Sequence, residues 1–263
     1  MSEAPANSAE RLVARQMHSS CRLSGRSMAL LLVAALSLVG WSSECLAKEL
    51  VKQGDGVRVY LLGETRGGLP RMVAETRVEG SVFEVLAVIM DVDRSCQWAG
   101  RCLIARIVER ERLGRVRLYS RRKAPWPISD RDFELRTDVD IAAGGHRVTA
   151  RFWNVADART PRQAGVVRMP LLRGHYRLKR VSDRLTDVEF LIEANPGGWI
   201  PKWVVRWTAE ALPYSSLRGL RRQVVRTRGK YAGVIKKIER AVAAGSPGAV
   251  GASTEPKPRR QGP

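Results

Sequence analysis

The sequence predicts an α+β fold in which a strongly curved antiparallel sheet wraps around a long C-terminal helix. Short alternating segments separated by turn residues follow one another between Val57 and Ala194, a pattern typical of antiparallel strands. The last apolar pattern has helical spacing instead. A helix of roughly 30 residues is about 45 Å long, and a curved sheet can bury the apolar side of such a helix.

The first expected elements are two strands and a short helix. Residues 57–62 and 71–80 alternate as strands do, and Gly80 ends the second. Ser81 and Glu84 have the spacing of a capping box, and the apolar residues that follow share one helical face. The sequence therefore predicts a helix over 81–91.

Strands return after this helix, and their short connections predict an antiparallel meander. Gly114, Gly144 with Gly145, and Gly174 supply turns between them. The expected strands are about 103–111, 114–123, 130–142, 146–155, 164–171, 174–182 and 185–194.

Charged residues alternate with apolar ones along the expected strand 130–142. Asp132, Glu134 and Asp138 share one face, and the preceding strand carries Arg117 and Arg121 on the corresponding face. Opposite charges on adjacent strands can pair across the ladder. The pattern favours a solvated outer face, where exposed pairs contribute about 0–1 kcal/mol each.

The C-terminal part changes to helical periodicity. Trp199, Trp203 and Trp207 are four residues apart and share one helical face. Pro213 is expected to begin a new helix that continues to about Ala244.

The two ends of the chain are expected to lie outside the folded domain. Arg22 and Arg26 precede an apolar run that is too short for a membrane span, which is typical of a signal peptide. We expect residues 1–47 to be this signal, cleaved near Ala47; an uncleaved anchor is the alternative. Residues 48–244 form the domain, and 245–263 form a disordered tail. Export predicts a periplasmic location if the organism is bacterial.

A formal net charge of +20 favours anionic partners such as lipid headgroups, a membrane surface or nucleic acid. The alternative explanation is a genome of high GC content, which favours Arg over Lys. Nucleic acid is disfavoured because the arginines are spread along strands and no recognition motif is present.

Cys96 and Cys102 are the cysteines of the expected mature chain. Their spacing leaves both a disulfide and two free thiols open. His146 and His175 do not lie in a ligand-spaced cluster, so neither a metal nor another cofactor is expected.

Three stretches resemble the START family, the steroidogenic-acute-regulatory-protein-related lipid-transfer domains. They are YSRRKAPWPISDRDFELRT (119–137), ANPGGWIPKWVVRW (194–207) and ALPYSSLRGLRRQV (211–224). The likeness covers about Glu49 to Ala244. It implies a helix-grip fold with the ligand between the sheet and the C-terminal helix, and a loop near that helix gating entry.

The resemblance also implies where the ligand lies, with ordinary core packing as the alternative for each residue. Arg131 shares strand parity with Phe133, so we expect it to point into the cup, either toward a ligand headgroup or in a turn ion pair. The expected ligand-binding residues are Trp126, Arg131, Phe133, Phe152, Met169, Trp199, Trp203, Leu220 and Val224.

The functional prediction is a monomeric, non-enzymatic lipid carrier. Its ligand could be a phospholipid, a sterol-like molecule or a fatty acid, and its basic surface could dock on an anionic membrane. The alternative is a polyketide cyclase or aromatase-like enzyme of the same superfamily.

Overall fold

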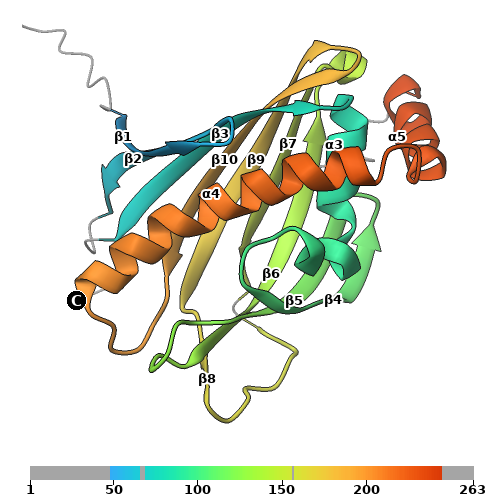
Figure 1. Ribbon diagram of the computed structural model, residues 1–263. Coiled ribbons are helices and arrows are strands. Elements are labelled where there is room, and N and C mark those ends of the chain that lie inside the picture. The colour runs from blue at the N-terminus through green and yellow to red at the C-terminus, as the bar shows by residue number, and fades with distance from the viewer. Residues whose placement is uncertain (1–47, 66–68, 156, 245–263) are drawn as a thin grey trace, which may run out of the picture. The chain divides into compact units, whose positions relative to one another are not determined.

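The computed structural model describes residues 48–65, 69–155 and 157–244. The expected signal peptide and the expected tail lie outside these residues. The described residues form a 10-stranded sheet, and helix α4 runs across its concave face (Figure 1). The strands are β1 (Glu49–Gly54), β2 (Val57–Glu64), β3 (Pro70–Glu79), β4 (Cys102–Arg112), β5 (Arg115–Arg122), β6 (Asp130–Ile141), β7 (Arg147–Asn154), β8 (Val166–Arg168), β9 (Leu171–Ser182) and β10 (Leu185–Asn195). The helices are α3 (Val82–Met90), α4 (Lys202–Arg226) and α5 (Ala232–Ala243), with 3-10 turns η1 (Val92–Gln97) and η2 (Ala143–Gly145).

The strand order is β1-β2-β3-β10-β9-β7-β6-β5-β4. The predicted antiparallel pairing is confirmed along this path, but the simple meander is not, because β10 returns beside β3. The segment β8 is also an exception, since it pairs with β6 in parallel. The expected strand 164–171 is wrong in extent: Pro170 has no N–H to donate to a ladder, and β9 begins after it at Leu171.

The predicted capping box at the start of α3 is confirmed. The Glu84 N–H donates to the Ser81 side chain at 3.2 Å, and the Ser81 N–H donates to the Glu84 carboxylate at 2.8 Å. These bonds satisfy N–H groups that the first turn leaves without helical acceptors. They fix α3 against the sheet, where Leu86 is fully buried.

The C-terminal helix differs from its prediction. It begins at Lys202 and continues through Pro213 rather than starting there. A proline inside a helix removes one hydrogen bond, which packing along the rest of α4 offsets. Thr227 ends the helix by donating its side-chain O–H to the Gln223 carbonyl at 2.8 Å. Gly229, at φ +79°, then separates α4 from α5, so residues 213–244 are not one helix.

The main core lies between α3, α4 and the inner face of the sheet. Leu217 and Leu220 of α4 are completely buried, as is Val57 of β2. Gly219 permits a close approach, because a Cβ at this position would lie 2.0 Å from the Trp98 carbonyl oxygen. None of the described helices has the length and apolarity that a membrane crossing requires.

The charged face of β5 and β6 is buried, not solvated as the sequence pattern predicted. Asp132 and Glu134 are 1% exposed, and Arg117 is 2% exposed. The segment that connects β7 with β9 covers them: the N–H groups of Arg159 and Thr160 donate to Glu134 at 3.1 and 2.9 Å. Burial opposes ionisation of Glu134, but these bonds outweigh it and hold the pKa of the carboxyl below its ordinary value.

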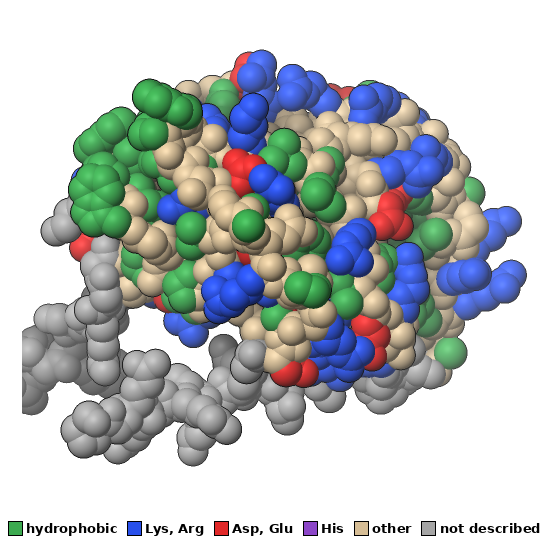
Figure 2. All heavy atoms as spheres, turned by 90° about the horizontal axis from the view of Figure 1, so that it is seen from below, with side chains coloured by type: hydrophobic (Ala, Val, Ile, Leu, Met, Phe, Trp, Pro, Cys, Tyr) green, Lys and Arg blue, Asp and Glu red, His purple; other side chains and the backbone are tan. Residues whose placement is uncertain are grey.

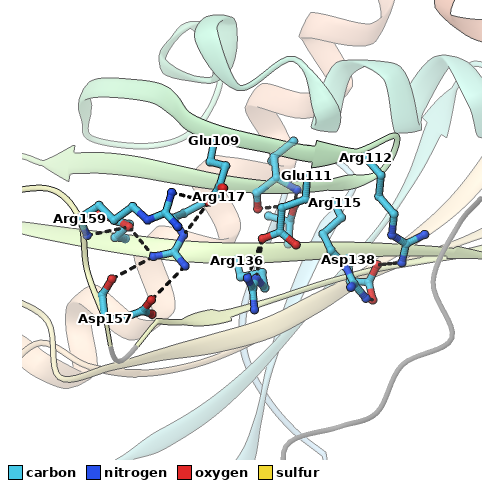
Figure 3. A network of polar contacts seen from close by, with 12 residues as sticks. Glu109, Glu111, Arg112, Arg115, Arg117, Arg136, Asp138, Asp157 and Arg159 are labelled. Atoms are coloured by element: carbon cyan, nitrogen blue, oxygen red, sulfur yellow. Dashed lines mark hydrogen bonds and ion pairs between the residues drawn. The ribbon is translucent and has the colours of Figure 1, made fainter.

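Ion pairs continue from this buried group toward the edge of the sheet (Figure 3). Arg117 lies 3.5 Å from Glu109 and 3.4 Å from Asp157, and Arg159 lies 3.0 Å from Glu109. The network thus ties β4, β5 and the covering segment together.

Candidate functional site

A cavity of about 250 Å³ lies between α4 and the sheet. We call it the inner cavity. Strands β3, β5, β6, β7, β9 and β10 contribute to its wall, and so do η1, the 123–128 segment and the first half of α4. Its lining is mainly apolar and includes Met72, Leu118, Phe133, Leu135, Phe152, Met169, Leu172, Tyr176, Phe190, Ile192, Ala194, Val204, Ala209 and Leu212.

Aromatic rings form one side of the inner cavity. Tyr176 and Phe190, opposite each other on β9 and β10, stack with ring centroids 4.3 Å apart. Phe152 of β7 lies 6.1 Å from Phe190. Gly174 leaves room for Phe152, since a Cβ there would lie 2.7 Å from its ring. Rings packed in this way offer a rigid apolar surface.

Four cationic side chains line the inner cavity, whereas no Asp, Glu or His among the described residues does. Arg122 of β5 is half-buried, and its guanidinium lies 5.7 Å from the centre of the Phe133 ring. Desolvation by the surrounding protein lowers the pKa of Arg122 to about 10. The other cations are Arg101, Lys123 and Arg131.

Arg131 joins the start of β6 to the turn before α4. Its guanidinium donates to the carbonyl oxygens of Pro196 at 3.3 Å and Gly197 at 3.1 Å, and also to that of Ser129. Burial lowers the pKa of Arg131, and no carboxylate among the described residues lies within ion-pair distance of it. The predicted turn ion pair is therefore wrong, because backbone carbonyls take the place of the acid.

A second hollow of about 600 Å³ adjoins the inner cavity, and Pro125, Ile128, Arg131 and Val204 line both. We call it the Trp groove, because four tryptophans line it. Three of them are largely exposed: Trp126 at 93%, Trp199 at 88% and Trp203 at 73%. The fourth, Trp207, lies 5.2 Å from the Arg101 guanidinium. Figure 2 shows hydrophobic side chains gathered at one edge of the face seen from below, with Lys and Arg spread over the rest.

The η1 segment on the cavity wall is held by a disulfide between Cys96 and Cys102, which decides between the two alternatives left open by their spacing. Trp98 lies inside this loop and lines the inner cavity. Its indole N–H is buried and has no acceptor among the described residues.

A helix-covered, apolar cavity with an aromatic mouth fits the family that the sequence resembles. The START domain family model matches residues 27–226. The chain belongs to the START domain family. In this START domain the cavity lies between the curved sheet and α4. The predicted helix-grip fold is confirmed by the similarity to solved START structures.

Three similar proteins show how far the likeness extends. An uncharacterised protein of Pseudomonas aeruginosa is 28% identical over 191 residues, which cover 72% of this START protein and 93% of that one. The phosphatidylcholine transfer protein of Bos taurus is 28% identical over 181 residues, covering 67% and 80% respectively. The crystal structure of a STAR-related lipid transfer protein fragment from Xanthomonas axonopodis superimposes with a TM-score of 0.62 at 28% identity, covering 67% of this chain and 98% of that one.

The START fold brings most of the predicted ligand-binding residues to one of the two hollows. Arg131, Phe133, Phe152 and Met169 line the inner cavity. Trp126, Trp199 and Trp203 line the Trp groove. Contact of these seven with a ligand stays a prediction.

Leu220 and Val224 line neither hollow. Leu220 is completely buried and Val224 is 3% exposed in the main core. The cavity-lining part of α4 lies before residue 217, so for these two residues the structure shows core packing, the alternative to ligand contact.

Sequence reasoning missed Arg122, Tyr176 and Trp98 as residues of the cavity wall. A signal for Arg122 was available. Arg121 and Arg122 are consecutive in a strand, so their side chains point to opposite faces of the sheet. Arg121 pairs with Asp130 at 2.7 Å on the outer face, which directs Arg122 inward.

Proposed function

We propose that this START domain is a non-enzymatic carrier that binds a lipid in the inner cavity and moves it between membranes. The observation that carries the proposal is the apolar, ring-lined cavity beneath α4. Two relatives named as lipid transfer proteins support it. Each buried methylene contributes about 0.8 kcal/mol, so a lipid tail leaves a membrane readily only when an apolar cavity receives it. The candidate ligands are a phospholipid, a sterol-like lipid and a fatty acid.

Docking on an anionic membrane is the second part of the proposal. Exposed Trp126, Trp199 and Trp203 surround the Trp groove, and tryptophan is enriched at membrane–water interfaces. Lys123 and Arg206 are exposed near these side chains in sequence, and a basic residue close to an anionic surface contributes about 1 kcal/mol. The groove shares residues with the inner cavity, so a lipid entering there has a short path inside.

We further propose that the protein is exported and acts as a monomer in the periplasm. Two observations support export. Residues 1–47 have the sequence pattern of a signal peptide. The disulfide between Cys96 and Cys102 is the second, because disulfides persist in oxidising compartments.

The first test is native mass spectrometry of the protein purified from cells, followed by organic extraction. A stoichiometric lipid that is released on unfolding supports the carrier and identifies its class. A transfer assay follows, in which labelled lipid moves from donor to acceptor vesicles. Protein that carries no lipid and does not accelerate transfer of any of the three candidate classes would contradict the proposal.

A further inference from the structure

The wall of the inner cavity has an excess of hydrogen-bond donors and of positive charge. Of its charged residues in the described part of the chain, all four are Arg or Lys. Arg101 and Lys123 are exposed, and Arg131 already donates to backbone carbonyl groups. A lipid that offers only apolar contacts would therefore leave mainly Arg122 without acceptors, and a buried polar group without a partner is costly. The ligand should therefore supply the missing acceptors.

Arg122 is the cation with the most donors to spare. A guanidinium has five N–H donors, and among the described residues one bond from Arg122 is present, to the Gly100 carbonyl oxygen at 3.1 Å. No carboxylate in this part of the chain lies within ion-pair distance. Arg131 differs, since three carbonyl groups already accept from it.

A neutral residue with a donor, Tyr176, belongs to the same cavity wall. Among the described residues, the Tyr176 hydroxyl has no hydrogen-bond partner. Arg122 and Tyr176 act electrostatically on each other. Arg122 and Tyr176 thus bring donors that lack an acceptor to the wall of one cavity.

We propose that the inner cavity is selective for lipids that carry an anionic group, a carboxylate or a phosphate, which Arg122 binds with help from Tyr176. The inference rests on the proposed function, because it assumes that a lipid occupies this cavity. Charge-assisted hydrogen bonds are about twice as strong as neutral ones, and apolar neighbours of Arg122 such as the Phe133 ring strengthen them further.

The test compares three single-chain probes that share an oleoyl or oleyl chain: oleate, oleoyl-lysophosphatidate and the neutral oleyl alcohol. A single chain suits a cavity of about 250 Å³. Affinities are measured with the full-length protein after delipidation, by intrinsic tryptophan fluorescence and native mass spectrometry. We expect at least one anionic probe to bind about 10- to 100-fold more tightly than the alcohol. Comparing oleate with the lysophosphatidate then separates a carboxylate ligand from a phosphate ligand.

Arg122→Met should remove this preference and leave the affinity for the alcohol within about twofold, since Met retains an apolar stem of similar length. Arg122→Lys should keep part of the preference. Tyr176→Phe, which deletes only a hydroxyl, should weaken anion binding several-fold without changing alcohol binding. Arg147→Met is the matched control, because Arg147 is exposed on β7, next to the inward-facing and buried Val148. Melting temperatures show which variants fold.

Equal affinity of the unaltered protein for the alcohol and both anions would overturn the anion site while leaving the carrier intact. So would an anion preference that survives in both folded Arg122→Met and Tyr176→Phe. Failure of all three probes and of phosphatidylcholine to bind would instead contradict the proposed function itself. If Arg122→Met does not fold, Tyr176→Phe and Arg122→Lys decide the question.

Discussion

Replacing Trp199 and Trp203 together by serine should strongly weaken membrane binding while leaving the fold intact. A Trp side chain can bury about 200 Å², so exposures of 88% and 73% leave about 180 and 150 Å² for contact with a membrane. If half of each area enters the interface, at about 25 cal/mol per Å², each residue contributes about 2 kcal/mol. The pair then contributes about 4 kcal/mol, or roughly a 1,000-fold change in partitioning.

Co-sedimentation with vesicles of phosphatidylcholine and phosphatidylglycerol measures this partitioning directly. Val181→Ser is the control, because Val181 is 45% exposed on β9, far along the strand from the Trp groove. Its binding should match that of the unaltered protein. The double Trp variant and Val181→Ser should both unfold at nearly the same denaturant concentration as the unaltered protein, since exposed side chains contribute little to stability. A double variant that binds vesicles within twofold of the unaltered protein would refute docking through the Trp groove.

Three further predictions concern the interior and its supports. Glu134→Gln should lower the free energy of unfolding at pH 7 by about 1–3 kcal/mol. Because the folded-state pKa of Glu134 is lowered, its stabilising contribution is present above the unfolded-state pKa near 4.3 and is lost as the pH falls through the folded-state value. Urea titrations in which the variant and the unaltered protein lose stability in parallel below pH 5 would count against this prediction. Ala194→Trp places a large ring in the inner cavity and should abolish lipid uptake in native mass spectra at a stability cost of about 1–3 kcal/mol; full lipid occupancy in the folded variant would place the ligand elsewhere. Cys96→Ser combined with Cys102→Ser should lower the free energy of unfolding by about 2 kcal/mol, and an unchanged melting temperature would show that the disulfide does not stabilise the domain.

The curved sheet could be predicted because its signals are local. Alternation marks the strands, and the capping box of Ser81 and Glu84 marks the start of a helix. The predicted strand 185–194 agrees with β10 to within a residue. The helix that lies on the sheet was harder to place, because Pro213 is also a common first residue of helices and the apolar spacing continues across the break at Gly229.

The site was predictable where it depended on strand parity and not where it depended on distant segments. Phe133 and Phe152 lie on the apolar faces of their strands, so their inward direction follows from alternation. Burial of Glu134 does not, because the covering backbone N–H groups belong to residues 159 and 160, and the strand pattern carries no information about them. Trp98 likewise reaches the cavity through the disulfide-closed loop rather than through a periodic element.

Charge is divided between the two faces of the sheet, and this division connects its stability with its proposed specificity. On the outer face each buried carboxylate has a close partner: Asp132 accepts from Arg168 at 2.7 Å, Glu134 from Arg117 at 3.3 Å and Asp138 from Arg115 at 2.7 Å. These carboxylates have their counter-charges without a ligand.

On the inner face the cations of the cavity wall have no such acids. For the half-buried Arg122 the lack of a counter-charge is unfavourable for folding. Its presence on the cavity wall has a physical explanation if an anionic ligand supplies the missing charge. In that case the bound lipid also stabilises the fold, because a ligand that binds the native state alone raises its stability. We therefore expect a larger rise in melting temperature on loading with an anionic probe than with oleyl alcohol, and expect Arg122→Met to raise the melting temperature of the lipid-free protein relative to Arg122→Lys. Ligand-free Met and Lys variants that melt at the same temperature would show that the cation is already accommodated without a ligand.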